Sequence, residues 1–208
     1  MLNLIRKDLL LNFSNKQSMV FLILFFPFML LILEKNSTNI YSLMILSYGY
    51  ILNNMPFKYE VINKTHMLIH SLPIKKKDVV ISKYISIFIN YFLGVILVVI
   101  YFGIISVFKI KIGENLSISL IRQTLIIFTF TTSISLPAYF RLPPRLGNIV
   151  NIMIYIIIIN IFVMGSSNNI DIFTALNAQR LNLPIIVAIV YLISMGISIG
   201  LYETRDLT

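Results

Sequence analysis

The chain has 208 residues, of which 58% are hydrophobic and only 12% are charged. Soluble domains carry about 25% charged residues, so this composition indicates a membrane protein with a single transmembrane domain over residues 1–208. The net charge of +9 does not indicate nucleic-acid binding, because the charges lie in short segments between apolar blocks, where membrane topology places them. The absence of cysteine excludes disulfides, thiol catalysis and cysteine-ligated metal sites.

The apolar blocks predict an all-α polytopic membrane protein with six transmembrane helices. The predicted spans are residues 18–33, 40–55, 84–108, 116–140, 148–164 and 184–202. The second block is the least apolar. It is predicted to cross because the N-terminus and the segment 57–83 are both cationic, which puts both in the cytoplasm and requires an even number of spans between them.

The positive charges also set the predicted orientation, with both termini in the cytoplasm. Arg122 lies within the fourth apolar block, and twelve of the other sixteen Lys and Arg residues lie in the predicted inner segments. The exceptions, in outer loops, are Lys35, Lys109, Lys111 and Arg180. Arg122 could contact an anionic substrate or lipid, but a position about two turns from the outer end favours snorkelling to the surface.

The first segment, residues 1–17, is predicted to be a helix lying along the membrane surface. Leu2, Ile5, Leu9 and Phe13 recur at helical spacing and would form its apolar face. A plain charged leader is the alternative.

The segment 57–83 is the long polar interval between two apolar blocks. Its first part predicts an amphipathic helix, which Pro73 ends. Lys75, Lys76 and Lys77 follow, and Asp78 is suited to the positive N-terminus of the next helix. This arrangement predicts a cytoplasmic element to which a soluble partner binds. The alternative is a helix that lies on the membrane and binds no partner.

The sequence offers few groups for catalysis or ion coupling. No GxxxxGK[ST] motif is present, and all eight acidic residues lie outside the predicted spans. Carriers driven by ion gradients usually need intramembrane carboxylates, so such a carrier is disfavoured. His66 and His70 share a helix face, but Met67 stands where HExxH requires glutamate, so two surface histidines are the better interpretation.

Polar residues on the fourth and fifth predicted spans admit two interpretations. Hydroxyl residues concentrate in the inner half of the fourth span, and three polar residues share a face at the inner end of the fifth. They would either line an inward-facing substrate pathway or form hydrogen bonds between helices. The pathway candidates are Thr129, Thr132, Asn148, Asn151 and Tyr155.

Four stretches, LIRKDLLLNF, HSLPIKKKDVVISKYIS, SLPAYFRLPPRLGN and YLISMGISIGLYETRDL, resemble the permease subunit of ABC-2 type ATP-binding-cassette exporters. The similarity is to the short six-span permeases of bacterial peptide and drug exporters, and it covers nearly the whole chain. Such a permease has no catalytic residues and binds no cofactor, since ATP and Mg²⁺ belong to a separate ATPase subunit.

The resemblance further implies a coupling helix that docks on the ATPase, at about Lys58–His70. The coupling residues would be Lys58, Lys64, His66, Met67, Leu68, Ile69 and His70. It also implies pairing with a second permease, contact with membrane lipid, a re-entrant segment within 165–183, and export of an amphipathic substrate across a bacterial cell membrane. An immunity or sensor protein that binds its ligand without transporting it is the alternative.

Overall fold

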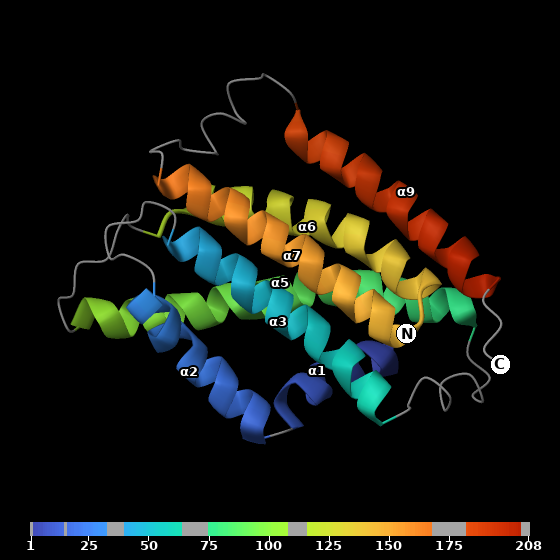
Figure 1. The fold of residues 1–208 in the computed structure, drawn as a ribbon, viewed down its shortest axis with the longest axis horizontal. Helices are drawn as coiled ribbons and strands as arrows, with labels where there is room; N and C mark the ends of the chain where they lie inside the picture. Colours follow the sequence, from blue (N-terminus) through green and yellow to red (C-terminus); the bar gives the residue numbers. More distant parts are fainter. Residues whose placement is uncertain are drawn as a thin grey trace.

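The computed structural model describes residues 2–14, 16–32, 40–63, 75–107, 116–167 and 182–204. These residues form helices and short connections, without a strand among them, so the predicted all-α fold is confirmed at this level (Figure 1). The helices are α1 (Leu2–Ser14), α2 (Lys16–Ile32), α3 (Ile40–Ile62), α5 (Lys76–Val107), α6 (Ile118–Arg141), α7 (Pro144–Ser167) and α9 (Leu183–Glu203).

Three helices, α5, α6 and α9, are long and apolar enough to cross a membrane. The axes of α1 and α2 differ by 70°, and the pair makes a fourth candidate if it counts as one bent span. The apolar part of α7, Leu146–Ile161, is shorter than the 18 residues taken as the least for a span. Length and composition of the described helices therefore support three or four spans, and six spans remain a prediction.

Several helix boundaries differ from the apolar blocks. Helix α3 continues to Ile62, past the predicted end at residue 55, so Lys58 lies in its last two turns. Helix α5 begins at Lys76 with Asp78 in its first turn, as predicted for this acidic residue. The remaining predicted coupling residues, Lys64, His66, Met67, Leu68, Ile69 and His70, lie outside the described residues, as do 168–181 of the predicted re-entrant segment.

Proline and serine set the ends of α6 and α7. The Ser117 side chain accepts a hydrogen bond from the Leu120 amide and caps α6. Leu142 is extended, at φ −82° and ψ 155°, which suits the residue before a proline and ends α6. Helix α7 begins directly at Pro144, four residues before the predicted span, because proline is well suited to the first turn of a helix.

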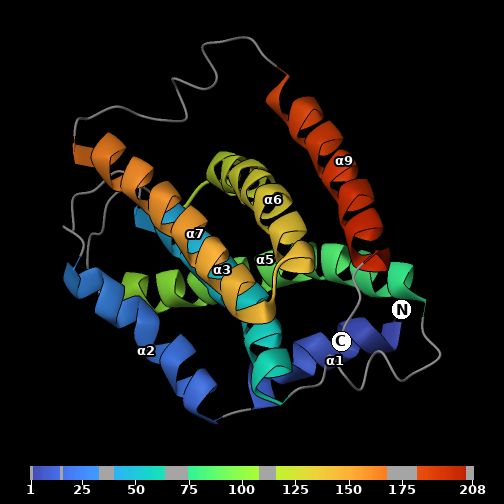
Figure 2. The same ribbon diagram turned by 45° about the vertical axis from the view of Figure 1, so that its right-hand side comes forward.

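Helix α3 packs most extensively against α5, and α6 against α9, while α7 covers α3 and α6 (Figures 1 and 2). The backbones of α3 and α5 come close where they cross, since a Cβ on Gly94 would lie 3.1 Å from the Gly49 nitrogen. Tyr84 of α5 hydrogen-bonds with Ser194 and Ser198 of α9, at 2.7 and 2.8 Å. Close packing and interhelical hydrogen bonds therefore hold the helices together.

Large apolar side chains remain exposed on the outward faces of α2, α5, α7 and α9, as expected of helices that face lipid. The Gly196 and Gly200 pair belongs to this open surface. A Cβ at either glycine would meet no atom of the described chain within 4 Å. This GxxxG pattern therefore does not pack against another described helix.

Helix α1 packs against the protein through a face that includes only part of its predicted apolar face. Ile5, Asp8 and Asn12 are buried, whereas Leu2 and Phe13 are exposed. The polar side of the helix therefore packs against the protein, and part of its apolar side is left free for the membrane.

Candidate functional site

A wide cavity opens between α2, α3 and α7, near their predicted cytoplasmic ends. The space in which the centre of a water molecule fits is about 530 Å³. This cavity, called the wide cavity below, is lined by Gln17, Ser18, Phe21, Tyr50, Ile51, Asn54, Met55, Lys58, Tyr59, Ile62, Asn148 and Ile152. Its size and mixed polar and apolar lining suit an organic ligand.

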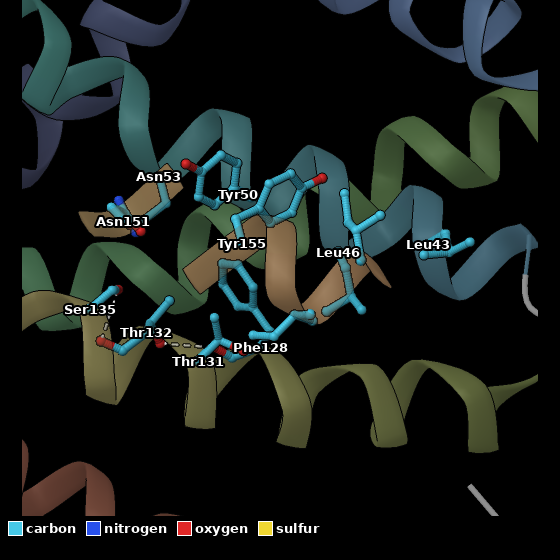
Figure 3. A pocket seen from close by; sticks show the side chains of 12 residues that line it. Leu43, Leu46, Tyr50, Asn53, Phe128, Thr131, Thr132, Ser135, Asn151 and Tyr155 are labelled. Carbon is cyan, nitrogen blue, oxygen red and sulfur yellow. Dashed lines mark hydrogen bonds between the residues drawn. The ribbon is translucent and has the colours of Figure 1, made fainter. Parts of the chain in front are cut away.

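A narrow pocket lies next to the wide cavity, between α3, α6 and α7 (Figure 3). The space in which the centre of a water molecule fits is about 20 Å³ in this pocket, which is enough for about one water molecule. The narrow pocket is lined by Leu43, Leu46, Tyr50, Asn53, Phe128, Thr131, Thr132, Ser135, Asn151, Tyr155, Ile158 and Ile159.

Two contacts between α3 and α7 lie at the boundary of these spaces. Tyr50 lines both of them, and its ring stacks on that of Tyr155 with centroids 3.7 Å apart and planes at 5°. The Asn151 amide donates a hydrogen bond to the side-chain oxygen of Asn54, which joins a residue of the narrow pocket to one of the wide cavity. Figure 3 shows Tyr50 and Tyr155 side by side in the narrow pocket. The two contacts therefore hold α3 and α7 together where the narrow pocket meets the wide cavity.

The structure brings most of the predicted pathway residues to these two spaces. Thr132, Asn151 and Tyr155 line the narrow pocket, and Asn148 lines the wide cavity. Thr129 is buried but lines neither, and its hydroxyl donates to the Leu125 and Ile126 carbonyls of its own helix.

The Thr124 hydroxyl of α6 shares a hydrogen bond with the Tyr91 hydroxyl of α5 at 2.7 Å, but the hydroxyl groups in the inner half of the fourth predicted span do not bridge helices. Those of Thr131, Thr132, Ser133 and Ser135 all donate to carbonyls one turn earlier in α6. A hydrogen bond does join α9 to this part of α6, but its donor is on α9: the Ser194 hydroxyl donates to the Ser133 backbone carbonyl at 2.6 Å. In the described chain these side chains therefore satisfy themselves locally and leave a weakly polar lining.

A buried charge cluster joins α1, α3 and α5 at the predicted cytoplasmic end. The Lys83 ammonium lies 3.0 Å from Asp8 Oδ2 and 2.8 Å from Glu60 Oε1, and Lys7 Nζ lies 2.7 Å from the same Glu60 oxygen. Asp8, Lys83 and Glu60 are 2%, 6% and 9% exposed. Two cations and two carboxylates balance in formal charge, as burial of such groups requires.

Neighbouring groups stabilise this cluster further. The Lys83 ammonium lies 4.4 Å from the centre of the Phe57 ring, within the range of a cation–π contact. Burial disfavours the charged form of Glu60, but the attraction of the Lys83 and Lys7 ammonium groups outweighs it and lowers the pKa of the Glu60 carboxyl. The Glu60 carboxyl therefore stays ionised at neutral pH.

The sequence analysis did not predict this cluster, because Asp8 lies in the first segment and Glu60 and Lys83 lie in the segment 57–83, which were predicted as separate elements. A usable signal was present in the first helix. Asp8 and Asn12 are one turn apart and lie on the same face as Ile5, which marks a polar face facing the protein. No comparable signal in the sequence indicates that Glu60 and Lys83 pair with this helix, because they are distant from it in the chain.

Comparison with known families gives a match over almost the entire chain. The model of a family described as ABC-2 family transporter protein matches residues 3–203. Comparisons with curated proteins and with solved structures found no match. Since the family match covers far more than half of the sequence, the chain belongs to the ABC-2 transporter family of membrane proteins.

Proposed function

We propose that this chain is the membrane-spanning permease subunit of an ATP-driven exporter that moves an amphipathic molecule, such as a peptide, toxin or drug, out of a bacterial cell. The match of residues 3–203 to the ABC-2 family carries the proposal. The chain would pair with a second permease and with a separate ATPase subunit, which would bind ATP and Mg²⁺. It would itself contribute no catalytic residue.

The two cavities support a substrate pathway along α3 and α7. The wide cavity has room for part of an amphipathic molecule and combines apolar with hydrogen-bonding groups. The narrow pocket adjoins it at Tyr50 and lies further towards the middle of the helices. Opening of the Tyr50–Tyr155 and Asn54–Asn151 contacts, driven by the ATPase, would then extend the pathway.

Purification with the ATPase tests this function. A tagged copy of the chain is expected to co-purify with a protein whose ATP hydrolysis depends on this chain. Inside-out membrane vesicles containing both subunits are then expected to accumulate an amphipathic peptide when ATP is added, and not when the ATPase carries an inactivating substitution. Binding of peptide without ATP-dependent accumulation would instead favour the immunity or sensor alternative.

We expect the termini and the segment 57–83 to face the cytoplasm, because the cations concentrate there. Single cysteines at Lys76, Asn36 and Asn168 suit this cysteine-free chain. Membrane-impermeant thiol reagents added to intact cells are expected to label the cysteines at Asn36 and Asn168 but not the one at Lys76. Labelling at Lys76 from outside, or at Asn36 only from inside, would contradict the six-span arrangement.

Met67, Leu68 and Ile69 are expected to anchor the ATPase, because large apolar groups at the centre of an interface dominate binding. Leu68→Ala or Ile69→Ala is expected to weaken ATPase association by about 2 kcal/mol, a roughly 30-fold loss of affinity, while the protein still inserts. Lys76→Ala is the matched control with a mild effect, since exposed cations contribute about 0–1 kcal/mol. Unchanged recovery of the ATPase in pull-downs of the alanine variants of Met67, Leu68 and Ile69 would eliminate this assignment.

A further inference from the structure

The lining of the wide cavity is divided into two layers along the helix axes. In α2, Gln17 and Ser18 come first and Phe21 follows one turn deeper. In α7, Asn148 precedes Ile152 by one turn. All three helices end or begin at this cavity, so the polar layer forms its mouth and the apolar layer its inner part.

Helix α3 runs in the opposite direction and shows the same division in reverse. Ile51 and Met55 lie in the inner layer, whereas Lys58 and Tyr59 lie in the mouth. The Tyr59 hydroxyl is 2.5 Å from the Ser18 hydroxyl, which ties the mouth of α3 to that of α2. Two residues depart from this division: Ile62 is an exposed apolar residue in the last turn of α3, and Asn54 is a polar residue of the inner layer whose side-chain oxygen accepts a hydrogen bond from Asn151.

Lys58 is the only residue of the lining with a formal charge at neutral pH. It is exposed and forms no salt bridge with any residue of the described chain. Glu60, two residues later, belongs to the charge cluster with Lys7 and Lys83 on a different face of α3. The mouth therefore holds a positive charge that no acidic residue of the lining balances.

Two helix N-termini add to this positive potential. The first turn of α2 supplies Gln17 and Ser18 to the mouth, and the second turn of α7 supplies Asn148. Helix N-termini carry a partial positive charge, so both favour an anion at the mouth. Below it, the apolar layer favours a hydrocarbon chain or an apolar side chain.

We propose that the wide cavity binds an amphiphile with an anionic head, and that Lys58 pairs with this head at the mouth while the apolar part occupies the inner layer. The proposal assigns Lys58 to ligand binding and not to the ATPase contact. It deepens the proposed export function by naming the charge of the ligand, and it rests on that function only for what happens to the ligand after binding.

Binding to the purified chain in nanodiscs of zwitterionic lipid tests the proposal without the ATPase. The probes are dansyl-labelled dodecanoate and a dansyl-labelled dodecylamine, which have the same chain and opposite charge. The dodecanoate is expected to bind more tightly. Lys58→Gln is expected to weaken dodecanoate binding roughly ten-fold, the effect of losing a hydrogen bond to a charged group.

Lys77→Gln is the matched control, because Lys77 is exposed at the start of α5 and does not line the cavity. It removes the same charge and is expected to leave binding unchanged, whereas Lys58→Arg is expected to retain it. Equal binding of the two probes, or equal losses in Lys58→Gln and Lys77→Gln, would overturn the proposal.

A second arm identifies the source of the anionic head. In nanodiscs that contain phosphatidylglycerol, weaker binding of dodecanoate to the wild type would assign the site to an anionic membrane lipid. Unchanged binding would assign it to an amphiphile that enters from the cytoplasm. A failure of ATP-dependent export would leave these binding results intact, so the two proposals can fail separately.

Discussion

Lys83→Met is expected to lower the free energy of unfolding by about 3–5 kcal/mol, the cost of removing one partner from a buried ionic contact. The reason lies in the charge cluster, where Asp8 and Glu60 would keep one of the cluster's two cations, Lys7. Denaturant titration of the purified protein in mixed micelles measures the change. Lys77→Met, on the same helix but exposed, is the control and should have little effect.

A double substitution separates charge from packing. Lys83→Met together with Glu60→Gln leaves Lys7 and Asp8, a balanced pair 3.3 Å apart. Since replacing both members of a buried ion pair is far less costly than removing one, the double variant is expected to be more stable than Lys83→Met alone. A double variant that is less stable than the single one would show that packing, and not the unpaired charge, sets the loss.

The same cluster predicts a dependence of stability on pH. The pKa of Glu60 is lowered in the folded protein, so its contribution is complete above the ordinary value of 4.5 and is lost as the pH falls below it. The wild type is therefore expected to lose more stability on acidification than Glu60→Gln does.

The second large effect is expected at the narrow pocket, where Thr132→Leu and Asn151→Leu should each reduce export roughly ten-fold. This corresponds to a loss of about 1.4 kcal/mol in the free energy of interaction with the substrate. Leucine at Thr132 adds bulk to a space that holds about one water molecule. Leucine at Asn151 removes the hydrogen bond to Asn54 and a polar group of the lining. ATP-dependent accumulation in inside-out vesicles measures the change.

Asn160→Leu is the matched control on α7. Asn160 is exposed and its amide donates to the Ile156 carbonyl of its own helix. Thr132→Val keeps the size of threonine without its hydroxyl, so it separates bulk from hydrogen bonding. If Asn151→Leu and Thr132→Leu assembled and exported as well as Asn160→Leu, these side chains would serve packing alone.

The helical fold was predictable because apolar blocks in a membrane protein must form structures that satisfy their own backbone hydrogen bonds. The helix ends were less predictable. Hydropathy marks where lipid contact ends, but α3 continues through polar residues to Ile62, where Phe57 and Glu60 are buried against neighbouring helices. Such a tertiary contact has no local sequence signal.

The same limit applies to the site. The polar stripe of Asn148, Asn151 and Tyr155 on α7 was visible at helical spacing, and the structure brings it to the two cavities. The partners from α3, Tyr50 and Asn54, were not predicted, because nothing local indicates which side of α3 faces α7. Thr129 was grouped with Thr132 by composition. It lies nearly one turn earlier on α6, and it lines neither cavity.

Helices α3 and α5 are joined at two separate points, the close crossing at Gly49 and Gly94 and the ionic contact of Glu60 with Lys83. The same number of residues separates the two points on each helix. That distance is roughly 16 Å at about 1.5 Å of rise per residue. Two helices in contact only where they cross could change their crossing angle. Two helices that are also joined at their ends move together as one rigid body. The segment 64–74 is attached to that body at both of its ends, so a force applied to the segment would rotate both helices together and would not spread them apart.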